Sequence, residues 1–357
     1  AGCGWDASYV SFKCLKVDLS ARLDLAVDIL LNPTFPEAEW GRIRGQTLAG
    51  LQAERDHAES RAYRALLSAL YDEGHPYRFP LAGTEVSVEG LTRADLMQFH
   101  ASFLVAGRST IIVAGDVDPR SLAAELEARL TSWTGLAGGL PVDPTSPRAD
   151  HPRVILLDRP GAPQAVVRAG HIGLARSDPA YEHMLVLNQI LGGQFSSRLN
   201  AKLREERGVT YGVRSSFDCR RQRGPFSISA AVQTSRLALS LDEIYQELAA
   251  LVGGRPPSQV ELDDARRALI EGQARLFETP TALVNRFGSL VVHGLPADHD
   301  AGFAERLAAI DLDSLIIAAN REIHPGSLVA VVVADAAQVV EDLERLDWAH
   351  VESMKDE

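Results

Sequence analysis

Apolar residues recur at helical spacing through much of the first third of the chain. In residues 18–31 (DLSARLDLAVDILL) they return every three or four positions, and the segment NPTFP then ends the helix. A longer helical stretch covers residues 37–70 and is interrupted near Asp56. Residues 91–104 predict a helix that opens on a threonine cap, and residues 121–130 predict a further short helix.

Strand-like and loop-like segments separate these helices. Residues 10–14 alternate apolar and polar side chains with the period of two that is typical of a strand, and residues 109–115 (STIIVAG) predict a buried strand. Residues 74–83 (GHPYRFPLAG) predict a loop. Residues 135–152 are rich in glycine and proline and nearly devoid of large apolar side chains, so we interpret them as a linker.

The second half of the chain repeats the first. Residues 91–116 align with residues 310–335 at a constant offset of 219, and Pro36 aligns with Pro257 at nearly the same offset. We therefore predict two homologous α+β domains, each with a mainly antiparallel sheet and helices packed on one face. The predicted boundaries are an N-terminal domain over residues 1–134, the linker over 135–152 and a C-terminal domain over 153–357.

The repeat also gives an expectation about the front of the first domain. The second copy begins near Arg153, and subtracting the offset of 219 puts the start of the first copy about 65 residues before Ala1. Residues 153–218 therefore have no counterpart in this sequence. We expect that the first domain lacks its front end.

Composition and charge narrow the class of protein. The 357 residues are 46% hydrophobic and carry a formal net charge of -12, which argues against a nucleic acid or an anionic membrane surface as the main partner. No apolar run approaches the roughly 18–20 residues of a membrane span. Three cysteines exclude a disulfide scaffold and a cysteine-rich zinc site. Cysteine usage leaves a bacterial cytoplasm and a periplasm equally open.

The unpaired segment, residues 153–218, carries the most distinctive motifs. It predicts two strands joined by a turn, a helix from Asp178 to Leu191, a second helix over 196–207 and a strand from Val209. Its motifs are PGAPQ, LGGQFSSRL and LREERGVTYGV, and the first half adds LLNPTFPEAE, GHPYRFPLAG and IIVAGDVD. On these motifs the whole chain resembles the pitrilysin/insulinase-type zinc peptidases, a family that includes the mitochondrial processing peptidase.

The resemblance implies a site built from two halves. In the family, one half supplies an H-x-x-E-H zinc motif and a glutamate on a following helix. The other half supplies an arginine and a tyrosine that contact the substrate backbone and the tetrahedral oxyanion. These correspond here to Arg204 and Tyr211, seven residues apart. The alternative is that Arg204 only pairs with an acidic neighbour such as Glu205, while Tyr211 fills a strand face.

The glycine-rich stretch before Arg204 faces the peptide-binding chamber in the family. The resemblance therefore implies peptide contact for Gly192, Gly193, Phe195 and Ser197. The alternative for the two glycines is an ordinary helix C-cap. A further candidate, Cys219, lies beside two arginines that could lower the pKa of its thiol, but a lone cysteine without a catalytic partner is more often inert.

The zinc motif itself is missing from this sequence. No two of its ten histidines are three or four residues apart, so no helical turn presents a histidine pair to a metal. The family's third ligand, six residues before an aspartate, corresponds to Gly50, which has no side chain to bind zinc, unless the alignment slips onto Glu54. We predict that this chain holds no metal and that zinc belongs to a partner chain or to a missing N-terminal segment.

These observations support three hypotheses. The first is a non-catalytic, substrate-binding subunit of a zinc metallopeptidase, which pairs with an H-x-x-E-H-bearing subunit in a heterodimer, or forms a homodimer, and binds a peptide substrate. The second is an N-terminally truncated catalytic zinc metalloendopeptidase of the same family. The third is a purely structural or assembly subunit, like the family's core proteins of respiratory complexes.

Overall fold

The computed structural model describes residues 1–136 and 151–354, which form two compact units. Of the described residues, unit 1 contains 1–53, 81–136 and 274–297, and unit 2 contains 54–80, 151–273 and 298–354. Most of the predicted linker, residues 137–150, lies outside the described residues. The domain boundaries at 134 and 153 stay a prediction.

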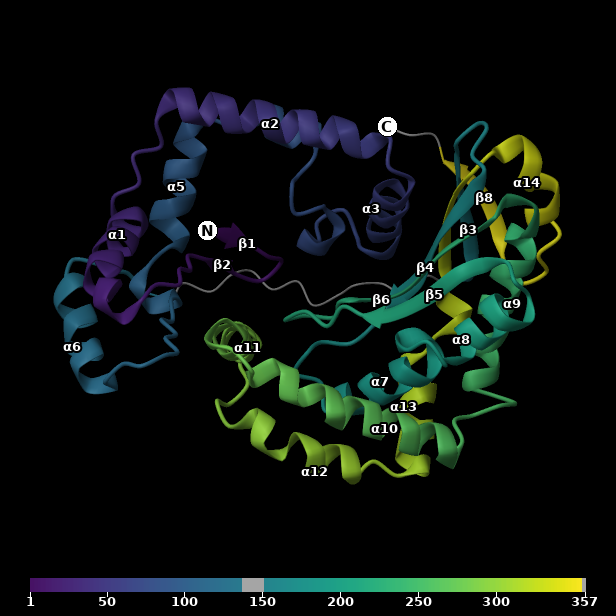
Figure 1. The fold of residues 1–357 in the computed structure, drawn as a ribbon. Helices are drawn as coiled ribbons and strands as arrows, with labels where there is room; N and C mark the ends of the chain where they lie inside the picture. Colours follow the sequence, from purple (N-terminus) through teal and green to yellow (C-terminus); the bar gives the residue numbers. More distant parts are fainter. Residues whose placement is uncertain (137–150, 355–357) are drawn as a thin grey trace. The chain divides into compact units, whose positions relative to one another are not determined.

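Unit 2 is built on a six-stranded mixed sheet with the order β5-β6-β4-β7-β3-β8 (Figure 1). Strand β3 runs parallel to its neighbours β7 and β8, whereas the pairs β4–β7, β4–β6 and β5–β6 are antiparallel. The sheet is therefore mainly antiparallel, as predicted. The strands are β3 (Arg153–Asp158), β4 (Gln164–Ile172), β5 (Thr210–Phe217), β6 (Pro225–Gln233), β7 (Val329–Ala334) and β8 (His350–Met354).

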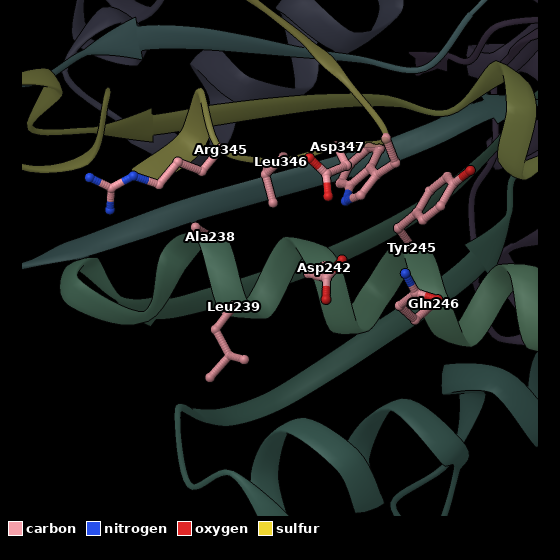
Figure 2. A pocket seen from close by; sticks show the side chains of 9 residues that line it. Ala238, Leu239, Asp242, Tyr245, Gln246, Arg345, Leu346 and Asp347 are labelled. Atoms are coloured by element: carbon pink, nitrogen blue, oxygen red, sulfur yellow. The ribbon is translucent and has the colours of Figure 1, made fainter. Parts of the chain in front are cut away.

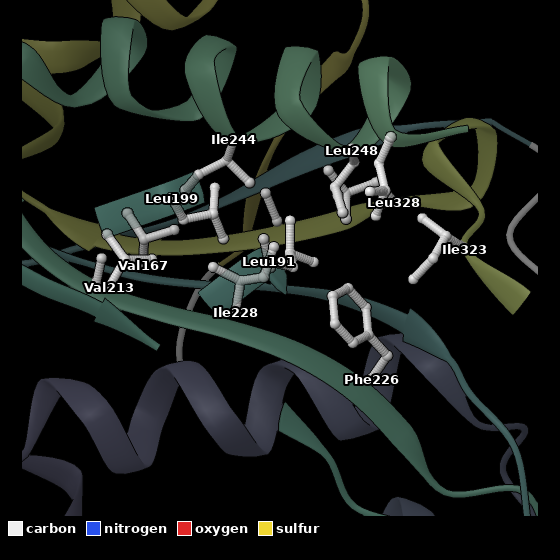
Figure 3. Packing of buried hydrophobic residues seen from close by; sticks show 14 of the residues in the cluster. Val167, Leu191, Leu199, Val213, Phe226, Ile228, Ile244, Leu248, Ile323 and Leu328 are labelled. Atoms are coloured by element: carbon white, nitrogen blue, oxygen red, sulfur yellow. The ribbon is translucent and has the colours of Figure 1, made fainter. Parts of the chain in front are cut away.

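Helices cover one face of this sheet and enclose the main core. Figure 3 shows Ile244 and Leu248 of one helix pointing at the sheet, where Val167, Ile228 and buried leucines fill the space between the layers. The helices are α7 (Tyr181–Asn188), α9 (Leu237–Leu251), α10 (Gln259–Gln273), α12 (Phe303–Ala308), α13 (Leu312–Glu322) and α14 (Ala336–Leu343). Helix α9 buries an apolar stripe at three- and four-residue spacing, which holds it on the sheet, whereas α10 and α12 pack against α7.

One helix from the first half of the chain packs on the opposite face of the same sheet. Helix α3 (Ala58–Leu70) lies against β4 and β7 and buries Ala62, Leu66, Leu67 and Leu70. Strand β7 (VAVVVA) is consequently buried at every position. Side chains alternate between the two faces of a strand, so a strand with helices on both sides needs a continuous apolar run.

Unit 1 is helical and carries only a two-stranded ladder of β1 (Gly2–Cys3) with β2 (Ser8–Tyr9). Its helices are α1 (Leu19–Leu31), α2 (Glu37–Arg55, whose last two residues fall in unit 2), α4 (Glu85–Gly90), α5 (Arg93–Phe103), α6 (Pro119–Arg129) and α11 (Pro280–Val292). The four helical segments predicted from residues 18 to 130 are confirmed.

The two strands predicted in this unit are wrong. Residues 10–14 and 109–115 are not strands, and Ile111 and Val113 are 48% and 42% exposed. Neither segment has a neighbouring strand among the described residues. An extended segment without a neighbour makes no ladder hydrogen bonds and buries no face, so the apolar pattern alone does not make it a strand.

The predicted repeat is visible in the elements themselves. Helix α5 and helix α13 begin and end at positions 219 apart, and their N-caps, Thr92 and Asp311, each accept a hydrogen bond from the backbone N–H three residues on. Helices α3 and α11 have 13 residues each, at an offset of 222. Helix α3 belongs to unit 2, and α11 belongs to unit 1.

Candidate functional site

The segment that carries the Arg/Tyr motif connects α7 to the edge strand β5. It contains two π-helical stretches, Gln189–Gly193 and Ala201–Glu206, around the short helix α8 (Arg198–Asn200). Gly208 then adopts a φ of +62°, a left-handed conformation that glycine takes without steric cost, and the chain turns into β5. The predicted order of helix, glycine stop, helix, glycine cap and strand is confirmed.

Arg204 lies at the surface against an aromatic ring. Its guanidinium carbon is 3.8 Å from the centre of the Phe195 ring, and Phe195 is itself 66% exposed. Arg204 Nε is 3.5 Å from a Glu205 carboxylate oxygen, so the acidic neighbour considered from sequence is also present. Stacking occupies a face of the guanidinium and leaves the in-plane N–H donors at its edge.

Tyr211 projects from a β-bulge at the start of β5. Thr210 pairs with Val232 and Val213 pairs with Ala230, so two residues of β5, Tyr211 and Gly212, lie opposite one residue of β6. Tyr211 is 92% exposed. It does not fill a strand face, and its phenol is presented to solvent on the strand that follows Arg204.

Close packing explains the two glycines at the end of the first helix, because Gly192 approaches β5 and Gly193 approaches Asn188 at the end of α7. A Cβ on Gly192 would lie 2.7 Å from Ser215 Oγ and 2.8 Å from Ser215 N, and one on Gly193 would lie 2.8 Å from the Asn188 carbonyl oxygen. Neither glycine has a positive φ, so the left-handed C-cap is not the reason for them. They are needed because the helix end packs directly on neighbouring backbone.

The four residues for which peptide contact is predicted differ in their exposure to solvent. Gly193 and Phe195 are exposed, whereas Gly192 and Ser197 are buried. The Ser197 hydroxyl accepts a hydrogen bond of 3.0 Å from Asn200 Nδ2. Ser197 thus lies beneath the exposed residues and takes part in holding the turn. Peptide contact by this segment stays a prediction.

The buried side chain of an arginine joins this turn to helix α10 and to the loop before it. Arg198 donates to both carboxylate oxygens of Glu261, at 2.6 and 2.8 Å, and to the carbonyl oxygens of Arg255 and Pro256. Burial of Glu261 would raise the pKa of its carboxyl, but the hydrogen bonds from Arg198 and Ser258 outweigh it and lower that pKa to about 2. Residue Arg198 was not among the sequence candidates, because only the fold reveals its acceptors.

The described residues do not fit a zinc site. Gly50 is exposed on α2 with no atom within 4 Å of where its Cβ would be, and Glu54 is engaged with Arg64 at 2.6 Å. Across residues 1–136 and 151–354, no three His, Cys, Asp or Glu side chains cluster as metal ligands would. Neither the expected third-ligand position nor its alternative is set up to bind a metal.

Cys219 is shielded. Burial raises the pKa of its thiol to about 12, against the opposing effect of Arg176. At neutral pH the group is therefore a protonated thiol, and the structure favours the inert interpretation over the reactive one.

A hollow of about 600 Å³ lies elsewhere on unit 2, between α9 and the turn before β8 (Figure 2). Asp242 of the helix and Arg345 and Asp347 of the turn line it, and Tyr245 stacks on Trp348 with ring centres 4.4 Å apart. None of the residues predicted from sequence lines this hollow.

Among the residues that the structure describes, no helix is both long enough and apolar enough to cross a membrane.

Comparison with known proteins identifies the family. The family model described as "Peptidase M16 inactive domain" matches residues 90–269, half of the chain, and the chain belongs to this family of peptidase-like domains. An uncharacterized zinc protease of Mycobacterium leprae is 29% identical over 279 residues, which are 77% of this chain and 61% of that protein. A non-peptidase homolog of Helicobacter pylori is 25% identical over 307 residues, covering 83% of this chain and 68% of the relative.

Solved structures agree with this assignment. The crystal structure of a peptidase M16 inactive domain from Pseudomonas fluorescens superposes with a TM-score of 0.82 at 28% identity, covering 89% of this chain and 75% of that one. A protease from Helicobacter pylori superposes at 0.78 with 18% identity, covering 89% and 77%, which shows the shared fold. The chain spans about three fifths of the length of the mycobacterial relatives it matches.

Proposed function

We propose that this chain is a non-catalytic, substrate-binding part of an M16 zinc peptidase and that it contributes Arg204 and Tyr211 to a peptide-hydrolysing site. The observation that carries the proposal is the pairing of an exposed tyrosine on a bulge with an arginine stacked on an exposed phenylalanine. Tyrosine and arginine are the residue types enriched where proteins bind other chains, and together they offer an aromatic face and several hydrogen-bond donors to a peptide. The zinc and its ligands would belong to an H-x-x-E-H-bearing partner chain.

The two side chains suit a role in holding a peptide and stabilising charge on its carbonyl. The guanidinium of Arg204 offers in-plane N–H donors and the phenol of Tyr211 offers an O–H donor. Donors aimed at a peptide carbonyl bind it in the ground state and strengthen when negative charge develops on its oxygen. Water activation and proton transfer to the leaving amine are not assigned to this chain, whose described residues hold no metal site.

Peptide hydrolysis by the complex of this chain with its partner tests the proposal. Arg204→Ala and Tyr211→Phe should each lower kcat/KM by roughly 10²-fold, the magnitude typical for loss of an oxyanion donor. Arg214→Ala is the matched control, because it removes an exposed arginine from the same strand β5. Unchanged kcat/KM in both Arg204→Ala and Tyr211→Phe would refute the proposal and leave the structural-subunit hypothesis.

A second candidate rests on the length of the relatives. The chain matches about three fifths of proteins named as zinc proteases, so the alternative is that it is part of a catalytic metalloendopeptidase whose zinc motif precedes Ala1. The N-terminal sequence and intact mass of the protein from its source distinguish the two. An upstream H-x-x-E-H in the same polypeptide would decide for the catalytic peptidase, and a front end without it would decide for the partner subunit.

A further inference from the structure

One buried side chain makes hydrogen bonds both to strand β5, which carries Tyr211, and to the turn that carries Phe195. Asn200, at the end of α8, is 6% exposed, and its amide makes hydrogen bonds in two directions. Toward β5, its Nδ2 donates to the Val213 carbonyl oxygen at 2.8 Å and its Oδ1 accepts from Val213 N at 3.0 Å. Toward the preceding turn, Nδ2 donates to the Gln194 carbonyl oxygen at 3.2 Å and to Ser197 Oγ at 3.0 Å.

The bonds to Val213 fix one end of the bulge that carries Tyr211. β5 is an edge strand, so the N–H and C=O of Val213 that point away from β6 have no strand to pair with. The Asn200 amide supplies the missing donor and acceptor, as a residue of a neighbouring strand would. Thr210 fixes the other end, because its hydroxyl donates to the Ala231 carbonyl oxygen at 2.6 Å and receives a hydrogen bond from Gly212 N.

The bonds to Gln194 and Ser197 fix the turn that carries Phe195. Phe195 lies between these two residues and is the ring on which the Arg204 guanidinium stacks. The same amide therefore restrains the bulge of Tyr211 and the aromatic support of Arg204. An asparagine amide has two N–H donors and one oxygen acceptor; here three acceptors share the two N–H groups, and the oxygen accepts from Val213 N.

We infer that Asn200 is a positioning residue, which sets the place of Tyr211 relative to the Phe195–Arg204 pair so that both reach one peptide backbone. The inference rests on the proposed function and goes beyond it by assigning the spacing of the two contacts to a group that touches no substrate. Asparagine is a poor residue for a helix interior. Its burial here makes sense as the means of joining helix and strand at this point.

A double-mutant cycle on the full chain tests the inference, with binding of fluorescein-labelled oxidised insulin B chain, a disulfide-free peptide, measured by anisotropy. Asn200→Ala should weaken binding about tenfold in the otherwise unaltered chain. In a chain that already carries Arg204→Ala and Tyr211→Phe, the same change should weaken binding less than about twofold. A merely structural role predicts the same loss in both backgrounds, and that result would overturn the inference.

Two further variants keep the outcome interpretable. Ser215→Ala is the matched control, because it removes one 2.8 Å hydrogen bond between β5 and Asn188 without touching the bulge, and it should change binding less than about twofold. Thr210→Val is the alternative variant if Asn200→Ala does not fold. It releases the other end of the bulge, so the loss of peptide binding that it causes should also depend on the presence of Tyr211. Thr210→Val with equal losses in both backgrounds would also count against the inference.

Hydrogen exchange provides a readout that needs no ligand. Because Asn200 Oδ1 accepts from Val213 N, Asn200→Ala should speed amide exchange across residues 210–214 by about tenfold or more. An unchanged exchange rate in these residues would overturn the inference about Asn200 and leave the proposed function unaffected. If the unaltered chain does not bind the peptide, the proposed function fails and the inference fails with it.

Discussion

The ion pair between Arg198, which lies in the segment between Phe195 and Arg204, and Glu261 of α10 gives a prediction whose size can be worked out from the structure. The perturbation is Glu261→Gln, which removes the charge while keeping the shape of the side chain. The pKa of Glu261 falls from 4.5 to about 2 on folding, which corresponds to roughly 3 kcal/mol by linkage. The Glu261 side chain is 30% exposed, so solvent screening reduces the expected loss of stability at pH 7 to about 2 kcal/mol.

The pH dependence follows from the direction of that shift. A carboxyl whose pKa is lower in the folded chain stabilises the fold fully above its unfolded pKa of 4.5 and loses that contribution as the pH falls toward 2. The difference between the unaltered chain and Glu261→Gln should therefore be constant above about pH 5.5. It should fall to about half near pH 3.3, midway between the two values.

Urea unfolding at several pH values measures this difference. Unfolding is followed by the fluorescence of Trp348 in unit 2, in a chain in which Phe replaces the three tryptophans of unit 1. The matched control is Asp263→Asn on the same helix, which removes a half-exposed carboxylate 3.3 Å from Arg266 and should cost less than about 0.5 kcal/mol. A Glu261→Gln chain as stable as the unaltered one at pH 7, or a stability gap that does not shrink in acid, would refute the reasoning.

Three more predictions concern packing and reactivity in unit 2. Leu66→Ala should destabilise unit 2 by about 2–4 kcal/mol in urea, because this fully buried leucine holds α3 on the sheet; wild-type stability would contradict that packing. Gly192→Ala should lower the thermal midpoint, because its Cβ would meet Ser215 at 2.7 Å, and an unchanged midpoint would show that the helix end can move. Cys219 should resist iodoacetamide at pH 8 until denaturant is added, while exposed Cys3 reacts at once; rapid labelling of Cys219 in the native chain would contradict its raised pKa.

Local signals in the sequence predicted the elements whose causes are local. The threonine cap and apolar spacing of residues 91–104 are sufficient to specify α5, and the glycine at 208 is sufficient to end the helix before β5. The repeat added long-range information, because two aligned segments must have similar folds. At the offset of 219, α5 (Arg93–Phe103) and α13 (Leu312–Glu322) begin and end at corresponding positions.

Features that depend on residues distant in the sequence could not be predicted from the pattern of apolar and polar residues. The apolar run at residues 109–115 corresponds to that of β7 at the repeat offset, yet of these two segments only β7 has β3 and β4 beside it and is a strand. In the candidate site, the motif identified Arg204 and Tyr211, but nothing in the sequence marks Asn200. Its four hydrogen bonds exist only because the fold brings residues 194–197 and Val213 to its two sides.

The reciprocal placement of α3 and α11 has a consequence for how the chain arose. Each helix comes from one repeat and is built into the unit formed mainly by the other. Equivalent elements exchanged in both directions are what a domain-swapped homodimer contains. End-to-end fusion of two such protomers would yield this exchange directly, without any later rearrangement. Severing the chain between its halves would then regenerate two fragments that each hold a helix the other requires, so they should fold together and poorly apart.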